Sequence, residues 1–308
     1  MTTEERQERR VRVALCQVET RPWDLDGNAD RLLVALDRAA REGAELAVTP
    51  ECVFHGYGDP PPGEHVRGPL LDAAERLEGG PRVRAVRAAA ARHGMDVVLG
   101  FAERSDDGAR LHNTAALISG RGPDAGGVVY AYRKVHCRPF ESAEHQGAFT
   151  PGDAFHVAAR EYAGGRSRVG TFICFDREIP ESARCLRALG AELIACPLAT
   201  PTYDLYRPPG EGRADNEVIT RARAAENEVY IAVVNHAGRF NGGSLVVGPL
   251  GEPVAQMGSR AGVLVVDLPL GRVAEHHHAD PLGWMGWGYR RPAVYDRYLG
   301  VKAAPAPP

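Results

Sequence analysis

Three residues with reactive side chains stand at the ends of apolar segments that are predicted to be strands. Glu51 follows ELAVTP, Lys134 ends GVVYAYRK and Cys174 ends RVGTFIC. Because α/β folds assemble their sites at strand ends, we expect these side chains to meet although they are far apart in the chain. Each signal alone is weak, since a strand-end cysteine is usually a core residue and a lone glutamate or lysine is usually a surface charge. The joint pattern carries the prediction.

A thiol, a carboxylate and an ammonium together suit nucleophilic catalysis by cysteine. The thiolate is the nucleophile, and a free thiol is mostly protonated at neutral pH. Glu51 can accept the proton of Cys174, while the Lys134 ammonium favours the thiolate and stabilises the oxyanion of a tetrahedral intermediate. The backbone N–H of Phe175, directly after the nucleophile, is expected to be a second oxyanion donor.

The sequence resembles the nitrilase superfamily of carbon–nitrogen hydrolases over about residues 11–297, nearly the whole chain. The resemblance rests on a series of motifs in the family's order: Pro50-Glu51 with Phe54, Gly56 and Tyr57; Tyr132-Arg133-Lys134-Val135-His136; FTPGD at Phe149–Asp153; ICFDREIPE at Ile173–Glu181; RARAAEN ending at Glu226-Asn227; Tyr230 and Asn235; GPLG at Gly248–Gly251; and Arg290-Arg291-Pro292.

The resemblance implies a role for each of the three residues. Glu51 is then the general base, which later protonates the leaving amine, and Lys134 is the oxyanion stabiliser. Cys174 is the nucleophile, forming a thioester, or a carbamoyl-enzyme with a carbamoyl substrate, that water hydrolyses. The resemblance implies no metal and no organic cofactor.

Family members also carry a second glutamate in the loop after the lysine. In this chain Glu141 and Glu144 compete for that position. The family's usual offset from the aromatic residue of the FTPGD segment falls on His145, one residue past Glu144. We therefore predict Glu144 as the second active-site glutamate, its alternative being a solvated loop carboxylate.

The residues after the cysteine bear on which bond is cut. True nitrilases usually have Trp-Glu there, whereas this chain has Phe175-Asp176, which resembles the amidase and carbamoylase branches. Hydrolysis of a small amide or N-carbamoyl compound, releasing ammonia or an amine, is therefore the favoured reaction. An acyltransferase or a nitrile hydrolase on the same site is the alternative, and a catalytically silent binding protein is disfavoured by the presence of all three residues.

Four residues are candidates for substrate binding: Tyr57, Phe175, Arg177 and Thr200. Arg177 lies three residues past the nucleophile, where a guanidinium can clamp a substrate carboxylate bidentately or else pair with a neighbouring carboxylate such as Glu178. The branch that cuts N-carbamoyl D-amino acids carries two adjacent arginines here, and Glu178 replaces the second. Tyr57 and Thr200 are assigned to the pocket from their positions after strands.

The elements that position these residues alternate between strands and helices early in the chain and become consecutive strands later. The predicted strands are Val11–Gln17, Glu45–Thr49, Asp96–Glu103, Leu111–Ser119, Gly127–Lys134, Arg168–Ile173, Glu192–Cys196, Val229–Asn235, Ser244–Gly248, Pro253–Gln256 and Gly262–Asp267. The predicted helices are Asn28–Glu42, Pro81–His93, Pro180–Leu189 and Asn216–Asn227. This pattern indicates an α/β fold with mixed sheets and outer helices, and the resemblance implies a four-layer α-β-β-α sandwich.

Composition is consistent with one enzyme domain. The 308 residues, 44% of them hydrophobic, predict a single domain at residues 11–297 between tails at 1–10 and 298–308. A net charge of −3 gives no reason to expect nucleic acid or a membrane as partner, and no apolar run is long enough to span a bilayer.

Cysteine use and the N-terminus bear on location and assembly. Six scattered cysteines, none in a CxxC pair, and an N-terminus without an apolar signal region predict free thiols in the cytoplasm. Family members pair through helices, so we expect a homodimer or larger homo-oligomer. The expected interface elements are the helix from Pro180 and the C-terminal tail with Trp284, Trp287 and Tyr289.

Overall fold

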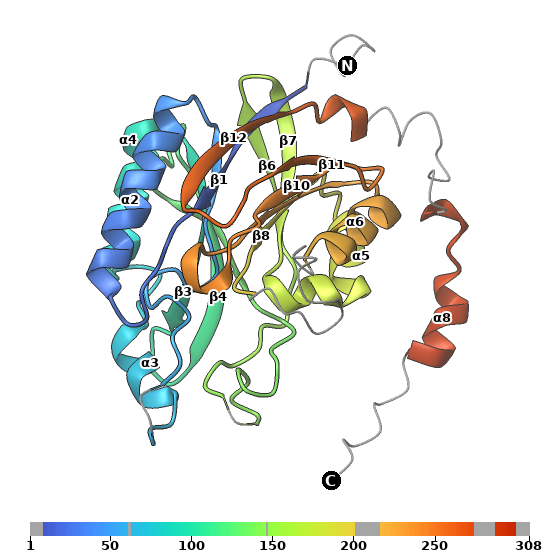
Figure 1. Ribbon diagram of the computed structural model, residues 1–308. Coiled ribbons are helices and arrows are strands. Elements are labelled where there is room, and N and C mark those ends of the chain that lie inside the picture. The colour runs from blue at the N-terminus through green and yellow to red at the C-terminus, as the bar shows by residue number, and fades with distance from the viewer. Residues whose placement is uncertain (1–8, 61–62, 146, 201–215, 274–286, 300–308) are drawn as a thin grey trace.

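The chain forms two six-stranded sheets packed face to face, with helices on both outer faces (Figure 1). The computed structural model describes residues 9–60, 63–145, 147–200, 216–273 and 287–299. The strand order is β12-β1-β2-β3-β4-β5 in the first sheet and β11-β10-β9-β8-β7-β6 in the second. The predicted four-layer α-β-β-α sandwich is confirmed.

The element bounds follow the predicted pattern closely. The strands of the first sheet are β1 (Val11–Gln17), β2 (Leu46–Val48), β3 (Asp96–Arg104), β4 (Leu111–Ile118), β5 (Val128–Arg133) and β12 (Gly262–Leu268). Those of the second are β6 (Val157–Tyr162), β7 (Gly165–Thr171), β8 (Leu193–Pro197), β9 (Tyr230–Val234), β10 (Leu245–Val247) and β11 (Pro253–Gln256). The helices are α2 (Leu25–Arg41), α3 (Arg67–Ala73), α4 (Pro81–His93), α5 (Pro180–Ala188), α6 (Asn216–Asn227) and α8 (Pro292–Leu299).

The two sheets share one pairing pattern. In the first, the central strands β1, β2 and β3 are parallel, β12 pairs antiparallel with β1, and β4 and β5 follow antiparallel on the other side. In the second, β7, β8 and β9 are parallel, β6 pairs antiparallel with β7, and β10 and β11 follow antiparallel. Strands β2 and β8 are therefore equivalent centres, and their carboxyl ends lie opposite each other across the sandwich.

The central strands β2, β8 and β9 are apolar because they are buried on both faces. Side chains alternate along β1: Val13 and Leu15 pack into the core between the sheets, whereas Ala14 and Cys16 pack beneath the outer helices. The two sets differ because successive side chains of a strand point to opposite faces of the sheet. On α2, Leu32 and the following buried positions complete the outer layer.

Local signals set the helix ends. The Asp24 side chain caps α2 by accepting from the N–H of Gly27 at 3.2 Å, and Arg38 and Arg41 lie in its last turn, where they complement the helix dipole. Helices α4 and α5 begin at prolines, where the missing N–H costs no hydrogen bond.

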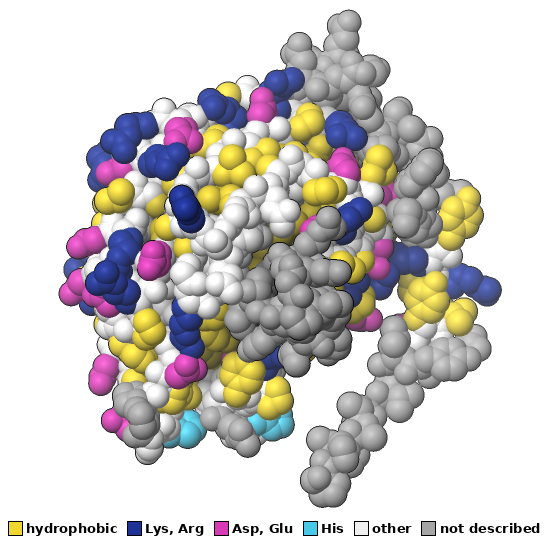
Figure 2. Space-filling model, viewed as in Figure 1, with side chains coloured by type: hydrophobic (Ala, Val, Ile, Leu, Met, Phe, Trp, Pro, Cys, Tyr) yellow, Lys and Arg dark blue, Asp and Glu magenta, His cyan; other side chains and the backbone are white. Residues whose placement is uncertain are grey.

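The structure adds elements that the sequence analysis did not predict, namely α3, β6 and α8, which continues to Leu299 and so crosses the predicted domain end at 297. Among the described residues no helix is long and apolar enough to cross a membrane. Figure 2 shows basic and acidic side chains interspersed on the visible face over α2. Trp284 lies outside the described residues, and the homodimer stays a prediction.

Candidate active site

The three predicted residues follow strand ends and converge at one side of the sandwich. Glu51 comes after β2, Lys134 directly follows β5 and Cys174 comes after β7. A cavity of about 370 Å³ opens onto Lys134 and Cys174, and Glu51 lies buried behind it, bonded to Lys134. We call this space the Cys174 cavity. The described residues that line it are Tyr57, Asp59, Lys134, Arg138, Phe140, Glu141, Cys174, Ala199, Thr200, Arg239 and Phe240.

The backbone of Glu51, which follows a strand of the first sheet, is held by two segments that follow strands of the second sheet. Its N–H donates to the carbonyl of Leu198, after β8, at 3.3 Å, and its carbonyl accepts from Nε2 of His236 at 2.7 Å. A carbonyl only accepts, so Nε2 of His236 carries the proton and Nδ1 accepts from Thr20 at 2.7 Å. Burial lowers the pKa of His236 to about 4, so this ring is neutral and its tautomer is fixed.

Glycine at position 100 allows the chain at Glu51 to lie against β3. A Cβ on Gly100 would come within 2.4 Å of the carbonyl oxygen of Pro50 and 3.0 Å of Cα of Glu51. The carbonyl of Gly100 also accepts from the N–H of Val53 at 2.9 Å. The close approach of the two backbones therefore requires a residue without a side chain.

Lys134 is buried between two carboxylates. Its Nζ lies 2.9 Å from Oε1 of Glu51 and 2.7 and 2.9 Å from the two oxygens of Glu141. Asn113, on β4, donates to Oε1 of Glu51 at 2.7 Å, and the hydroxyl of Tyr57 donates to Oε1 of Glu141 at 2.6 Å. With Lys134 only 1% exposed, these contacts compensate the burial of its charge.

The surroundings drive the two carboxyl pKa values apart. Burial, and the negative charge of Glu141, raise the pKa of Glu51 above its usual value, although Lys134 opposes them. Burial alone would raise the pKa of Glu141 as well, but the Lys134 ammonium and the hydrogen bonds from Lys134 and Tyr57 outweigh it, so this pKa is lowered. The two carboxylates raise the pKa of Lys134 against the effect of burial. Glu141 is thus the constant counter-ion, and Glu51 is the group able to exchange a proton.

One oxygen of Glu51 is available. Asn113 and Lys134 both donate to Oε1, whereas Oε2 is buried and has no hydrogen-bond partner among the described residues. A buried acceptor without a donor is costly, and such exceptions in a cleft are candidates for proton transfer.

Cys174 begins a short 3₁₀ helix, η1 (Cys174–Glu178), in a strained backbone conformation. Its φ of 46° is in the left-handed region that favours glycine, and strain of this kind is frequent at functional residues. Its Sγ lies 3.5 Å from Oγ1 of Thr200. Burial and the nearby Glu51 charge raise the pKa of Cys174 to about 12, although Lys134 opposes this, so the resting group is the thiol.

Asp176 fixes the segment after β5 relative to Cys174. It is fully buried and accepts from the hydroxyl of Tyr132 at 2.6 Å and from the backbone N–H of Ile173 at 3.0 Å. It also accepts from the backbone N–H of His136 at 2.9 Å and contacts Nδ1 of that ring at 2.8 Å. Because Tyr132 and His136 flank Lys134, these bonds set the position of the ammonium relative to the thiol.

The prediction of Glu144 as the second glutamate is wrong, because the structure places Glu141 there. Glu144 is exposed, whereas Glu141 is 4% exposed and contacts Lys134. A narrow loop explains the difference: the carbonyl of Glu141 accepts from the N–H groups of Ala148 and Phe149 at 2.9 and 2.8 Å, and Ala143, Glu144 and His145 between them are exposed. A Cβ on Gly147 would come within 2.0 Å of the Glu141 backbone, so the loop closes only with glycine there.

The other predicted binding residues lie in different places relative to the cavity. Tyr57 and Thr200 line the Cys174 cavity, and Phe175 lies beneath the guanidinium of Arg138, whose Cζ is 4.3 Å from the ring centroid. Arg177 does not reach the cavity: its side chain is 1% exposed, and its Nη1 lies 3.4 Å from the hydroxyl of Thr220 on α6. Arg177 thus lies within η1 with Nη1 against Thr220 of α6, and the carboxylate clamp at this residue stays a prediction.

Sequence reasoning missed several residues of the site. Asn113 sits in the middle of β4, where a buried amide gives no signal distinguishable from a core strand position. Arg138 and Phe140 lie between β5 and β6, in a segment where no strand end marks a single residue. Arg239 and Phe240 lie in the 3₁₀ helix η2 (Gly238–Phe240) after β9.

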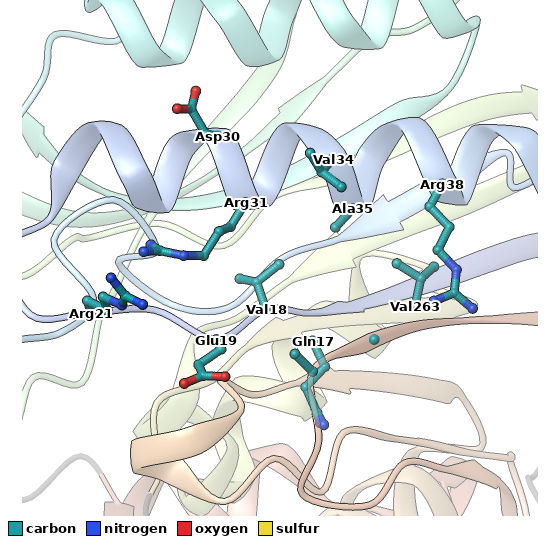
Figure 3. Close-up of a pocket in the computed structure, with 12 residues that line it drawn as sticks. Gln17, Val18, Glu19, Arg21, Asp30, Arg31, Val34, Ala35, Arg38 and Val263 are labelled. Carbon is teal, nitrogen blue, oxygen red and sulfur yellow. The ribbon is translucent and has the colours of Figure 1, made fainter.

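A larger cavity of about 530 Å³ lies on another side of the first sheet. Figure 3 shows Arg31, Ala35 and Arg38 of α2 facing Gln17 and Val18 at the end of β1 and Val263 of β12. The described residues around it include none of Glu51, Lys134 and Cys174. Size alone therefore does not identify the site, whereas the convergence of shifted titratable groups does.

Comparisons with known proteins show the family of the chain. The family model for carbon-nitrogen hydrolase matches residues 12–277. A hydrolase from the pqqF 5′ region of Pseudomonas protegens is 32% identical over 93% of this chain and 91% of its own length. An (R)-stereoselective amidase of Pseudomonas sp. is 31% identical over 84% and 85%, respectively.

Solved structures show the same relationship. An amidase mutant from Nesterenkonia sp. AN1, with the acetamide moiety of fluoroacetamide added covalently at its active-site cysteine, superposes with a TM-score of 0.74 at 28% identity. The match covers 95% of this chain and 98% of that one. From the family match, the relatives and the shared fold, the chain belongs to the carbon–nitrogen hydrolases of the nitrilase superfamily.

Proposed function

We propose that this carbon–nitrogen hydrolase is an amidase that cleaves a small amide or N-carbamoyl compound through a covalent intermediate on Cys174. The observation that supports it most directly is the arrangement of Glu51: one oxygen is engaged by Lys134 and Asn113, and the other has no partner in the described part of the chain. The charge of Glu51 also contributes to raising the pKa of Cys174. A cavity of about 370 Å³ is at the lower end of the range for small-molecule sites.

Acylation uses the neutral thiol directly. As Sγ of Cys174 attacks the carbonyl carbon, its proton passes to Oε2 of Glu51, whose raised pKa makes it a sufficiently strong base. A C–S bond forms and the carbonyl oxygen becomes an oxyanion, which Lys134 and the backbone N–H of Phe175 stabilise. When the C–N bond breaks, Glu51 returns the proton to the leaving nitrogen, which departs as ammonia or an amine.

Deacylation repeats the sequence with water. Glu51 takes a proton from the water that attacks the thioester or carbamoyl carbon, and the same donors stabilise the second oxyanion. The C–S bond then breaks, the proton returns to sulfur, and the acid or carbamic acid leaves. Throughout, Glu141 keeps Lys134 charged, because its own pKa is lowered and it holds the ammonium through both oxygens.

An amide or ureido group is preferred to a nitrile because of the residue after Phe175. Asp176 fills its position with four contacts to Tyr132, Ile173 and His136, in the place where nitrilases usually carry glutamate after tryptophan. The amidases among the relatives are consistent with this preference.

The experiment is a substrate screen of primary amides, N-carbamoyl compounds and nitriles that follows ammonia release, with hydroxylamine added in parallel. Cys174→Ala is expected to lower turnover by at least roughly 10⁴-fold, whereas Cys185→Ser, which alters an exposed thiol on α5, leaves it unchanged. Intact-mass measurement is expected to detect the acyl group on the wild-type chain. Unimpaired turnover in Cys174→Ala would refute the proposal. Formation of hydroxamate in place of free acid, at hydroxylamine concentrations far below that of water, would favour an acyltransferase.

A further inference from the structure

Asn113 is bonded to each of the three charged residues of the site. It lies in β4 and is 1% exposed. Its backbone carbonyl accepts from the N–H of Lys134 at 2.8 Å. Its Nδ2 donates to Oε1 of Glu51 at 2.7 Å and reaches Oε1 of Glu141 at 3.5 Å. One residue thus holds both the backbone that carries the ammonium and one oxygen of the base.

The amide of Asn113 has a defined orientation because its two ends meet different partners. Its Oδ1 accepts from Sγ of Cys52 at 3.4 Å. Burial raises the pKa of Cys52 well above its usual value, so this group stays a thiol that can donate. A flipped amide would place its oxygen against two carboxylates, which only accept when they are ionised. The thiol and the carboxylates therefore agree on one orientation, in which an N–H faces Glu51.

Cys52 itself lies in a strained stretch of backbone beside the base. Its φ of 50° is in the left-handed region that favours glycine. The N–H groups on either side of it are both engaged: that of Glu51 donates to Leu198 at 3.3 Å and that of Val53 to Gly100 at 2.9 Å. Strain of this kind persists only where the surroundings over-determine the backbone, and it is frequent at functional sites.

The bonds around Asn113 leave the two oxygens of Glu51 in different states. Asn113 and Lys134 share Oε1, whereas Oε2 has no hydrogen-bond partner in the part of the chain that the structure describes. Two donors on one oxygen restrict rotation of the carboxyl group. Burial raises the pKa of Glu51, and the hydrogen bond from Asn113 is one of the contacts that oppose this rise.

We propose that Asn113 is a positioning residue for the base, and that Cys52 acts on the base through the Asn113 amide. Asn113 holds Oε1 of Glu51, so the proton of Cys174, and later that of the attacking water, is exchanged at Oε2. This inference rests on the proposed function, in which Glu51 is the base, and it adds two residues that act through Glu51.

The other titratable groups around Glu51 do not account for a pH shift in variants of Asn113. Lys134 and Glu141 are held charged by each other, and neither is changed in these variants. The remaining described groups have pKa values that burial shifts toward the neutral form: Cys52, Tyr57, Cys137, Cys174, Cys196 and His236. A shift of the pH profile would therefore report the bond from Asn113 to Glu51.

Asn113→Leu keeps the size of the side chain and the backbone carbonyl that bonds Lys134, but it removes both bonds of the amide. With an amide found in the screen, the acid limb of kcat/KM is expected to move to higher pH by roughly one unit, because a hydrogen bond that favours the ionised base is lost. The kcat is expected to fall by about 10-fold and KM to stay within about 2-fold, since the base and not the substrate loses a contact.

Thr114→Val is the matched control on the same strand. It removes a buried hydrogen bond of 2.6 Å from Thr114 to Glu103, so it tests whether any loss of a polar contact in β4 has the same effect. It is expected to leave the acid limb and kcat unchanged at temperatures where circular dichroism shows both variants folded.

Cys52→Ala removes the thiol that polarises the amide. The kcat is expected to fall by about 3-fold, with the acid limb moving to higher pH by less than in Asn113→Leu. In the Asn113→Leu background the same substitution should change kcat by less than about 1.5-fold, because its path through the amide is gone. Cys16→Ala removes an equally buried thiol from β1, beneath the outer helices, and should change neither quantity.

An acid limb that stays in place or moves to lower pH in Asn113→Leu would overturn the positioning role. An unchanged limb and kcat in Cys52→Ala would overturn the action of Cys52, and this variant tests the hydrogen-bond chain even where Asn113→Leu does not fold. Equal effects of Cys52→Ala in the two backgrounds would also overturn it. Turnover that still depends on Cys174 would in each case leave the proposed function standing.

Discussion

Replacing Glu141 by glutamine tests whether this residue, and not Glu144, is the counter-ion of Lys134. The carboxylate of Glu141 accepts from Lys134 through both oxygens, from Tyr57, and through Oε2 from the backbone N–H of Arg138 at 2.9 Å. An amide retains one acceptor oxygen but turns its NH₂ group toward donors, and it removes the negative charge. Glu144→Gln is the matched control, because Glu144 is exposed and three residues away.

The structure sets the size of both effects. Removing one partner of a buried ion pair costs about 3–5 kcal/mol, and Lys134 keeps Glu51 as a second partner, so about 3 kcal/mol of unfolding free energy is expected to be lost. Roughly 2.1 cal/mol/K of unfolding entropy per residue over 308 residues converts each kcal/mol into about 1.5 °C, giving a Tm lower by about 5 °C. Because Lys134 is drawn toward Glu51 and away from the oxyanion, kcat is expected to fall by about 100-fold, similar to the loss of one oxyanion donor.

The measurements are ammonia release from an amide found in the screen and thermal unfolding by circular dichroism, at neutral pH for all three proteins. Glu144→Gln is expected to match the wild type within about 2-fold in kcat and about 1 °C in Tm, as for an isolated surface change. Equal losses in the two variants, or a wild-type kcat in Glu141→Gln, would refute the assignment of Glu141 as the counter-ion.

Three other outcomes follow from the geometry of the site. The wild-type kcat/KM should decrease as pH falls through the raised pKa of Glu51, since the base must be unprotonated. In Glu141→Gln this acid limb of the pH profile should move to lower pH, because the charge that raises the pKa of Glu51 is gone. An acid limb that moves to higher pH would contradict the coupling of the two carboxyl groups. Asp176→Asn places an NH₂ group among hydrogen-bond donors and should lower the free energy of unfolding by about 2–3 kcal/mol, which lowers Tm by about 3–5 °C. The kcat should be reduced even at temperatures well below Tm. A normal kcat in the folded variant would exclude the positioning role of Asp176. Tyr57→Phe removes one hydrogen bond to Glu141 and should lower kcat by about 10-fold, and a change in KM alone would instead make Tyr57 a substrate contact.

The strand ends could be predicted from the sequence because they depend on local pattern. Apolar runs of five to eight residues ending at Glu51, Lys134 and Cys174 are visible without tertiary information, and the structure brings Glu51 to Lys134 and places Lys134 and Cys174 on one cavity. Only the sandwich makes them neighbours, since each follows a strand with a different place in the two sheets.

The second glutamate could not be predicted because a loop's path depends on its own hydrogen bonds. Counting back from Phe149 uses the family's usual offset, whereas in this chain the N–H of Phe149 bonds directly to the carbonyl of Glu141, eight residues earlier. Gly147 was a possible signal, since the chain approaches Glu141 too closely there for any Cβ, but the sequence does not say which backbone the glycine contacts.

The direction of the Arg177 side chain could not be predicted from the sequence. The spacing of three residues from Cys174 was correct for one turn of structure, and η1 is such a turn. In the structure Nη1 of Arg177 lies 3.4 Å from the hydroxyl of Thr220 on α6. The guanidinium groups that line the Cys174 cavity belong instead to Arg138 and Arg239, in the segments after β5 and β9.

The pairing of β12 with β1 has a consequence for how the protein is made. Val11 pairs with Leu268, so the first strand to leave the ribosome waits for one of the last before its free edge is covered. At roughly 5–20 residues per second, about 250 residues take roughly 12–50 s to synthesise. During that time β1, an almost entirely buried apolar strand in the finished fold, presents unpaired N–H and C=O groups that other chains can join. A product that stops before β12 keeps that edge, and aggregation of such truncated chains is the expected cost of joining the two ends of the sequence in one sheet.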